Sequence, residues 1–178
     1  MSTAPADRVS TSLLSDAPLG EVTATADALQ IVFHRRYRAP IEKVWAALTT
    51  PARLADWLAV AEVDLRVGGS IRLNWNGMHQ AEVRITVCDP PRSFAWAWEI
   101  GGRDTLVRFD LAPEAGGCLL TLTHSGLSPR GGPGAGVRAG WHAHLEGLPD
   151  ALEGRATAWE VKTAREGALS DAYPKLPA

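Results

Sequence analysis

Cysteine, net charge and long apolar runs are all scarce in this 178-residue chain, and each scarcity excludes a class of protein. The two cysteines, Cys88 and Cys118, stand in strand-like runs without metal-ligand spacing, so we expect reduced thiols in a cytoplasmic protein. A net charge of −2 provides no field that would attract nucleic acid. The apolar runs are too short to cross a bilayer, and residues 1–20 lack the apolar core of a secretory signal.

Tryptophan, by contrast, is abundant, with seven residues in a chain whose length suits one domain. Large aromatic side chains are favoured where rigid apolar surface forms the wall of a pocket. Residues 1–18 are rich in Ser, Thr, Ala and Pro, which predicts a mobile N-terminal tail. We expect one domain at 19–155 and a C-terminal tail at 156–178 that packs on it.

The first elements of the domain are predicted by alternation and by proline. Apolar and polar residues alternate over about 28–38, which predicts a strand. Ala39-Pro40 and Thr50-Pro51 then open two short helices, because proline suits a first helical turn.

Arg35 shares the inward face of the first strand with Ile31 and Phe33. A lone buried charge is costly, so the side chain needs a partner or a path to solvent. We expect a structural ion pair, for which the candidates are Asp104, Glu82 and Glu99.

From Val60 to Ser125 the chain reads as strand after strand, separated by turns rich in Gly, Pro and Asp. One such run comprises Val63, Leu65 and Val67. Asn76-Gly77 is a strong hairpin signal, because both residues tolerate positive φ. Regular strands with short turns predict an antiparallel meander.

A long amphipathic helix is predicted over about 136–154, with Gly154 as its terminating residue. Its buried stripe follows the i, i+4, i+7, i+11 spacing of one helix face. The stripe consists of Trp141, Leu145, Leu148 and Leu152.

The order of several short motifs resembles a known superfamily. These motifs are Tyr37-Arg-Ala-Pro40, Val44-Trp45, Val67-Gly68-Gly69, Asp89-Pro90-Pro91, Leu122-Thr-His124 and Ala139-Gly-Trp-His142. Together they resemble the SRPBCC (START-like, helix-grip) superfamily, and within it the bacterial stand-alone relatives of the heat-shock-protein-90 ATPase activator domain. The likeness covers about residues 19–176. It implies an α+β fold, in which a curved antiparallel sheet wraps around a long C-terminal helix with an apolar cavity between them. It implies no particular reaction, because fold does not fix function.

We expect that cavity to bind a small apolar or aromatic ligand. His124 lies on the helix-facing side of the last strand, and a neutral imidazole there could bond to a ligand oxygen. With an ordinary pKa near 6.5, its titration would weaken binding between pH ~7 and ~5. The candidate ligand-binding residues are Trp57, Trp75, Trp96, Trp98, Phe109, Leu122, His124, Trp141, His144, Leu145 and Leu148.

Two patterns suggest a dinucleotide site and a metal site, but neither pattern is complete. Gly134-x-Gly136-x-x-Ala139 mimics a dinucleotide fingerprint, but no strand pattern follows residue 154 to complete the unit. His142 and His144 are two residues apart on a helix, so their side chains diverge and cannot share a metal. We therefore expect neither metal nor cofactor.

The patterns leave three functions open. The first is a binding or carrier domain for a small apolar molecule. The second is an enzyme of the polyketide cyclase or aromatase kind, with His124 or His144 as the base. The third is a protein-interaction module similar to the chaperone activator. No nucleophile and base combination is apparent, so no catalytic residue is assigned, and both monomer and homodimer remain open.

Overall fold

The computed structural model describes residues 18–129 and 133–173. The predicted tail at 1–18 therefore lies outside the described residues, apart from Pro18. The elements in chain order are β1 (Glu21–Ala24), β2 (Leu29–Tyr37), α1 (Ile41–Thr49), α2 (Pro51–Trp57), β3 (Val60–Val63), β4 (Ser70–Trp75), β5 (His79–Asp89), β6 (Ser93–Ile100), β7 (Arg103–Glu114), β8 (Gly117–Leu127), α3 (Pro133–Leu152) and α4 (Trp159–Ala172).

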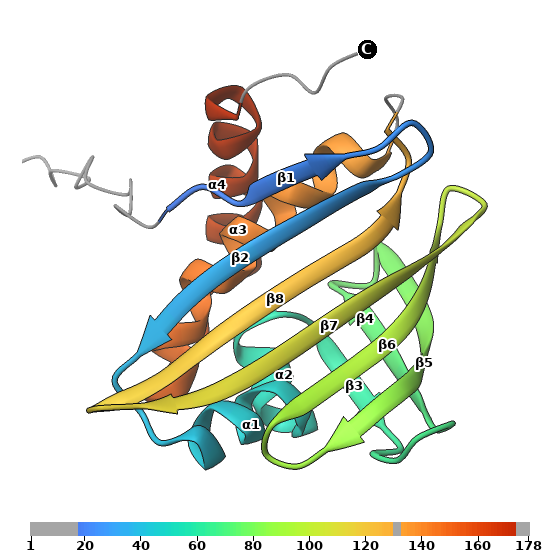
Figure 1. Ribbon diagram of the computed structural model, residues 1–178. Coiled ribbons are helices and arrows are strands. Elements are labelled where there is room, and N and C mark those ends of the chain that lie inside the picture. The colour runs from blue at the N-terminus through green and yellow to red at the C-terminus, as the bar shows by residue number, and fades with distance from the viewer. Residues whose placement is uncertain (1–17, 130–132, 174–178) are drawn as a thin grey trace, which may run out of the picture.

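All eight strands form one antiparallel sheet in the order β1-β2-β8-β7-β6-β5-β4-β3. Figure 1 shows this sheet curving, with α3 and α4 packed behind β2 and β8 and with α1 and α2 below them. Strands β3 to β8 run as a meander, and β2 closes the order by pairing with β8. The predicted α+β helix-grip fold is confirmed.

Local patterns in the sequence produce the strand expected over about 28–38, which is β2, and the hairpin expected at Asn76-Gly77. In β2 the buried and the more exposed residues alternate from Leu29 to Tyr37. Asn76 and Gly77 have φ angles of 53° and 73° and join β4 to β5, while Asn74 Oδ1 accepts a 2.8 Å hydrogen bond from Gly77 N. Positive φ at both turn positions matches the right-handed twist of the paired strands.

The long helix ends as its sequence predicts. Gly154 has a φ of 76°, and its N–H donates to the carbonyl oxygen of Ala151. The N–H of Arg155 donates to the carbonyl oxygen of Asp150. These two bonds form a Schellman motif, which satisfies carbonyls at the helix end.

Two expectations about the fold are wrong, and two elements were not expected. Strand β3 stops at Val63, and Val67 is 61% exposed, because the chain turns back through bonds from Arg66 N to Asp64 O and from Gly69 N to Arg66 O. Residues 159–172 form helix α4, and β1 is a further strand that was not expected.

Arg35 is the second correction. It points inward as expected, but no ion pair with an acidic residue forms within the described chain. Its guanidinium donates to the backbone carbonyls of His34 and Pro18 at 2.9 Å each, and it lies 5.2 Å from the centre of the Phe33 ring. Backbone carbonyls and an aromatic face thus replace the expected carboxylate.

The core lies between the concave face of the sheet and α3. Leu145 and Leu148 on α3 are almost fully buried, as are Trp96 and Phe109 on the sheet. Trp141 meets the Phe109 ring edge-on at 5.9 Å. The predicted contact between the late helix and the aromatic strands is therefore confirmed.

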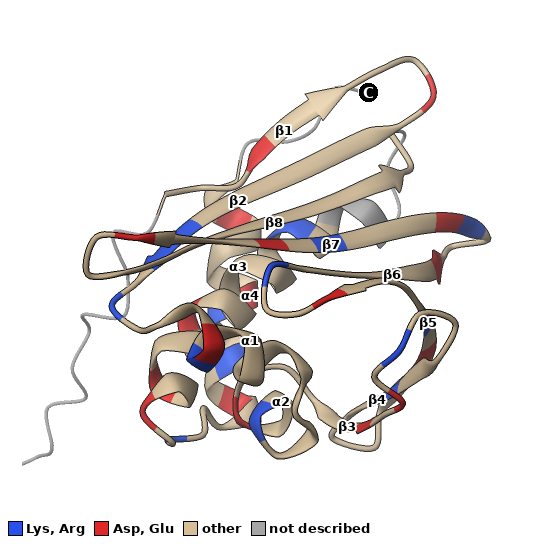
Figure 2. Cartoon of the chain, turned by 60° about the horizontal axis from the view of Figure 1, so that its bottom comes forward, with Lys and Arg blue, Asp and Glu red and all other residues tan. Residues whose placement is uncertain are grey.

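Acidic and basic side chains are interspersed over the helices and strands (Figure 2). Across residues 18–129 and 133–173, no helix is long and apolar enough to span a membrane. In the same residues, no cluster of three or more His, Cys, Asp or Glu could hold a metal ion. Cys88 and Cys118 are both unpaired.

Candidate functional site: a tryptophan-walled cavity

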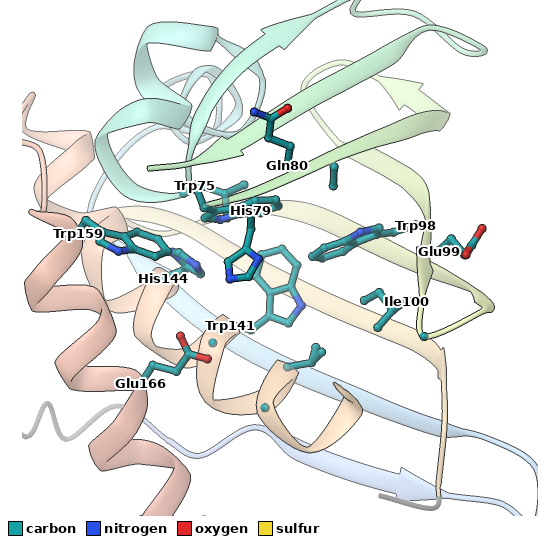
Figure 3. Close-up of a pocket in the computed structure, with 16 residues that line it drawn as sticks. Trp75, His79, Gln80, Trp98, Glu99, Ile100, Trp141, His144, Trp159 and Glu166 are labelled. Carbon is teal, nitrogen blue, oxygen red and sulfur yellow. The ribbon is translucent and has the colours of Figure 1, made fainter. Parts of the chain in front are cut away.

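A cavity of about 550 Å³ opens between strands β4 to β6 and helices α3 and α4 (Figure 3). Four tryptophans contribute to its walls: Trp75 at the end of β4, Trp98 on β6, Trp141 on α3 and Trp159 in the first turn of α4. Its volume lies within the range of roughly 300–1,000 Å³ that small-molecule sites occupy.

Trp75 and Trp98 stack with nearly parallel rings. Their ring centres are 5.9 Å apart and their planes differ by 9°. Both side chains are only partly buried, and both line the cavity (Figure 3). Two almost parallel indoles held by adjoining parts of one sheet offer a surface on which a planar ring can stack.

The α3 side of the cavity is open because glycine replaces side chains there. Gly136 and Gly140 lie one helical turn apart, and both line the cavity. A Cβ placed on Gly136 would meet no atom within 4 Å, and on Gly140 its nearest neighbour would be Glu166 Oε1 at 3.5 Å. Gly136, which belongs to the sequence that mimics a dinucleotide motif, thus leaves room over the helix together with Gly140.

Most polar groups of the cavity stand at its rim. His79, Gln80 and Glu99 are exposed, whereas Glu166 on α4 is partly buried. Burial raises the pKa of Glu166, and the nearby His79 lowers it in part. No Lys or Arg occurs among the described residues that line the cavity.

His144 is a polar group of the wall that a hydrogen bond holds in place. Its Nδ1 lies 3.0 Å from the backbone oxygen of Trp57, which also accepts a 3.3 Å bond from Lys162 Nζ. A carbonyl only accepts, so Nδ1 carries the proton and Nε2 bears a lone pair. Burial lowers the pKa of His144 to about 4, which keeps the ring neutral at pH 7.

His124 lies behind the cavity wall rather than on it. The side chain is fully buried, and both ring nitrogens are used. Trp141 Nε1 donates to Nδ1 at 2.9 Å, and Nε2 donates to Thr105 Oγ1 at 2.8 Å. Thr105 in turn donates to the backbone oxygen of Trp98 at 2.7 Å. The chain of bonds fixes the Trp141 indole and the backbone at Trp98 from behind.

The expected titration of His124 near pH 6.5 is wrong. Burial lowers its pKa to about 4, because the imidazolium would lose its hydration in this apolar surrounding. The ring is therefore neutral over the pH range in which the sequence predicts that binding weakens.

His142 diverges from His144 as predicted. It is buried on the far side of α3, where Nδ1 lies 2.7 Å from the hydroxyl of Tyr173 and Nε2 lies 3.3 Å from Glu146 Oε1. Glu146 also binds Arg165 through two bonds, of 2.6 and 2.8 Å. This cluster joins α3 to α4 and belongs to the packing of the helices.

The predicted ligand-binding residues fall into two groups. Trp75, Trp98, Trp141 and His144 line the cavity. The others pack in the core without reaching the cavity wall: Trp57, Trp96, Phe109, Leu122, His124, Leu145 and Leu148. Trp57, for example, donates its Nε1 hydrogen to the carbonyl oxygen of Ala47 at 2.9 Å.

The sequence interpretation missed several residues of the cavity. Trp159 and Glu166 stand seven residues apart on α4, which places them on one helix face. Their spacing could not be read, because no helix was expected there. The pair Gly136 and Gly140, at a spacing of four on the predicted helix, was a readable signal. His79, Gln80 and Glu99 carried no signal, because they come from strand ends.

The chain was compared with known proteins. The family model described as Activator of Hsp90 ATPase homolog 1-like protein matches residues 38–153. No curated protein matches the chain.

Solved structures of similar fold include CalU16 from Micromonospora echinospora, with 28% identity, a TM-score of 0.62, and coverage of 86% of this chain and 93% of that one. The Aha1 dimer from Colwellia psychrerythraea is 25% identical, with a TM-score of 0.60, and the match covers 70% of this chain and 96% of that one.

DynU16, a protein of the dynemicin biosynthetic locus, is 23% identical with a TM-score of 0.64, over 71% of this chain and 48% of that chain, and shows likeness of fold alone. The family model spans well over half of the sequence and matches the region that holds most of the sheet and α3. The chain belongs to the family of Activator of Hsp90 ATPase homolog 1-like proteins.

Proposed function

We propose that this protein binds a small aromatic molecule in the cavity between β4–β6 and α3–α4. The observation that carries the proposal is the cavity itself, which combines four tryptophans with the bare helix face at Gly136 and Gly140. Side chains that only filled a core would close such a space, because protein interiors pack to crystal-like density.

Hydrophobic walls with few fixed polar groups are typical of small-molecule sites. Here the aromatic wall is positioned in advance. The Trp141 indole is held through its bond to His124, and the ring of Trp98 stacks against the His124 ring at 5.9 Å. Walls that are ordered before binding reduce the entropy lost when the ligand enters.

Binding is favoured over catalysis. A cyclase-type reaction needs a general base whose pKa lies near the working pH. Burial lowers the pKa of His144 to about 4, which makes it a weak base, and His124 has no free nitrogen. We therefore assign His144 to recognition of the ligand.

The protein partner with the most support is a second copy of this chain. The Colwellia psychrerythraea relative is a dimer, and the edge strand β3 carries Val60 with 64% of its surface exposed. Sedimentation velocity over a concentration series measures this directly. The unpaired Cys88 and Cys118 support a reducing compartment such as the cytoplasm.

Intrinsic tryptophan fluorescence tests the binding proposal, because the tryptophans on the wall report an occupant. The protein is titrated with a panel of naphthalene and indole derivatives and with fractions of a cell extract. Saturable quenching by a panel member or an extract fraction is expected. A flat response to every panel member and every fraction would refute the proposal.

A further inference from the structure

The cavity holds one fixed hydrogen-bond acceptor. The backbone oxygen of Trp57 fixes the proton of His144 on Nδ1, so the acceptor lone pair lies on Nε2. His144 lines the cavity (Figure 3), and no described residue donates a hydrogen bond to Nε2. A ligand that places a hydroxyl or N–H group there would satisfy it.

The lowered pKa of His144 adds to this preference. With a pKa of about 4, the ring is neutral at pH 7 and Nε2 accepts rather than donates. Lys162 donates to the same carbonyl of Trp57, and its charge further disfavours the imidazolium. A group that only accepts hydrogen bonds gains nothing at this atom.

The charged groups around the cavity disfavour an anion. Glu166 lines it from α4 and is partly buried, and no described basic side chain lies within ion-pair distance of it. Glu99 adds a second carboxylate at the rim. Among the described residues that line the cavity, the remaining ionisable groups are His144 and the exposed His79. A ligand carboxylate would meet like charge in a partly desolvated space.

The shape of the wall completes the description. The nearly parallel, stacked rings of Trp75 and Trp98, with 9° between their planes, suit a flat ring system that stacks against them. We infer that the ligand is a planar aromatic molecule that donates a hydrogen bond from a hydroxyl group to Nε2 of His144 and carries no negative charge. This inference rests on the proposed function and narrows it to a class of phenol.

Three ligands that share one ring system test the hydrogen bond and the absence of negative charge separately. They are 2-naphthol, 2-methoxynaphthalene and 2-naphthoate. Calorimetric titration at pH 7 should show 2-naphthol binding about tenfold tighter than its methyl ether, as one hydrogen bond to a neutral acceptor provides. 2-Naphthoate should bind more weakly than both. Equal affinity for 2-naphthol and 2-methoxynaphthalene would overturn the inference while leaving the proposed function intact. If none of the three binds while another panel member or extract fraction does, the inference fails and the proposed function stands.

Two variants assign the effects to residues. His144→Leu should remove the advantage of 2-naphthol and leave 2-methoxynaphthalene unchanged, and Glu166→Gln should strengthen binding of 2-naphthoate. His34→Leu is the matched control, because His34 is exposed on β2 and bonds to Thr121. If 2-naphthol keeps its advantage in His144→Leu, the hydrogen bond to Nε2 of His144 is contradicted. If Glu166→Gln brings no gain for 2-naphthoate, the exclusion of negative charge by Glu166 is contradicted.

A second measurement of the hydrogen bond to His144 uses the wild-type protein alone and needs no variant. The ¹⁵N chemical shift of His144 Nε2 in the wild-type protein should change when 2-naphthol is added, and much less with 2-methoxynaphthalene. Identical shifts with the two ligands would overturn the assignment of the acceptor.

Discussion

Trp141 on α3 donates its indole N–H to Nδ1 of His124 on β8 at 2.9 Å, and this bond attaches the cavity wall to the sheet. Nε2 of the same histidine donates to Thr105, so the imidazole bridges a helix and two strands. All of these groups are buried, which makes each bond costly to lose. The histidine that sequence parity placed inside the fold thus positions a wall residue.

This arrangement predicts a clear ranking of substitutions at His124. His124→Leu leaves the indole N–H of Trp141 without an acceptor, so the free energy of unfolding should fall by about 1–3 kcal/mol. His124→Gln keeps an acceptor oxygen and a donor nitrogen and should lose less. Urea unfolding of both variants measures the difference. Equal losses would show that the hydrogen bonds contribute little.

The pH dependence of stability follows from the lowered pKa of His124. The folded pKa is about 4 and the ordinary value is 6.5, so the unfolded chain binds the proton first as pH falls. Stability from this residue is complete above pH 6.5 and declines from there towards pH 4. A residue that does not titrate at position 124, such as glutamine, should reduce the slope of stability against pH by up to about 1.4 kcal/mol per pH unit.

Unfolding curves of wild type and His124→Gln between pH 4 and 7 check this effect. His142 and His144 also have pKa values lowered to about 4 by burial, so a slope should remain in the variant. Parallel profiles for the two proteins would mean that His124 titrates alike in the folded and unfolded states.

The attachment of α4 depends on Glu146 and Arg165. Their two hydrogen bonds are 2.6 and 2.8 Å long, and both side chains are largely buried. Arg165→Met leaves the carboxylate of Glu146 without this partner beside His142, and should cost about 3–5 kcal/mol. The double variant with Glu146→Leu should recover part of that loss. Chemical denaturation of the three variants tests this, and an additive double variant would contradict it.

Sequence patterns predicted the fold more fully than the cavity, for physical reasons that particular residues show. Alternation in β2 and the pair Asn76-Gly77 act over a few residues, so they can be read locally. Leu65 and Val67 alternate equally well, yet both are exposed beside a turn. Periodicity alone does not say whether a partner strand continues.

The residues that build the cavity depend on how distant elements meet. His124 faces inward as parity predicts, but its bond to Trp141 requires the rotation of α3 over the sheet, which no local pattern encodes. Trp159 and Glu166 were missed because α4 buries few apolar residues, and Leu169 is its main anchor. A helix with so weak an apolar stripe gives little signal.

The central claim, that an aromatic ligand occupies the cavity, is tested most directly by filling that cavity. Gly136→Leu adds a side chain where a Cβ meets no atom within 4 Å, and leucine favours a helix more than glycine does. Gly167→Leu on α4 is the matched control, because its Cβ is equally unobstructed but Gly167 does not line the cavity.

The measurement is a fluorescence titration of both variants and of wild type with 2-naphthol, after thermal melts have shown that each is folded. The account predicts that Gly136→Leu binds at least about tenfold more weakly, a loss of ~1.4 kcal/mol, while Gly167→Leu binds like wild type. Undiminished affinity in folded Gly136→Leu would contradict it.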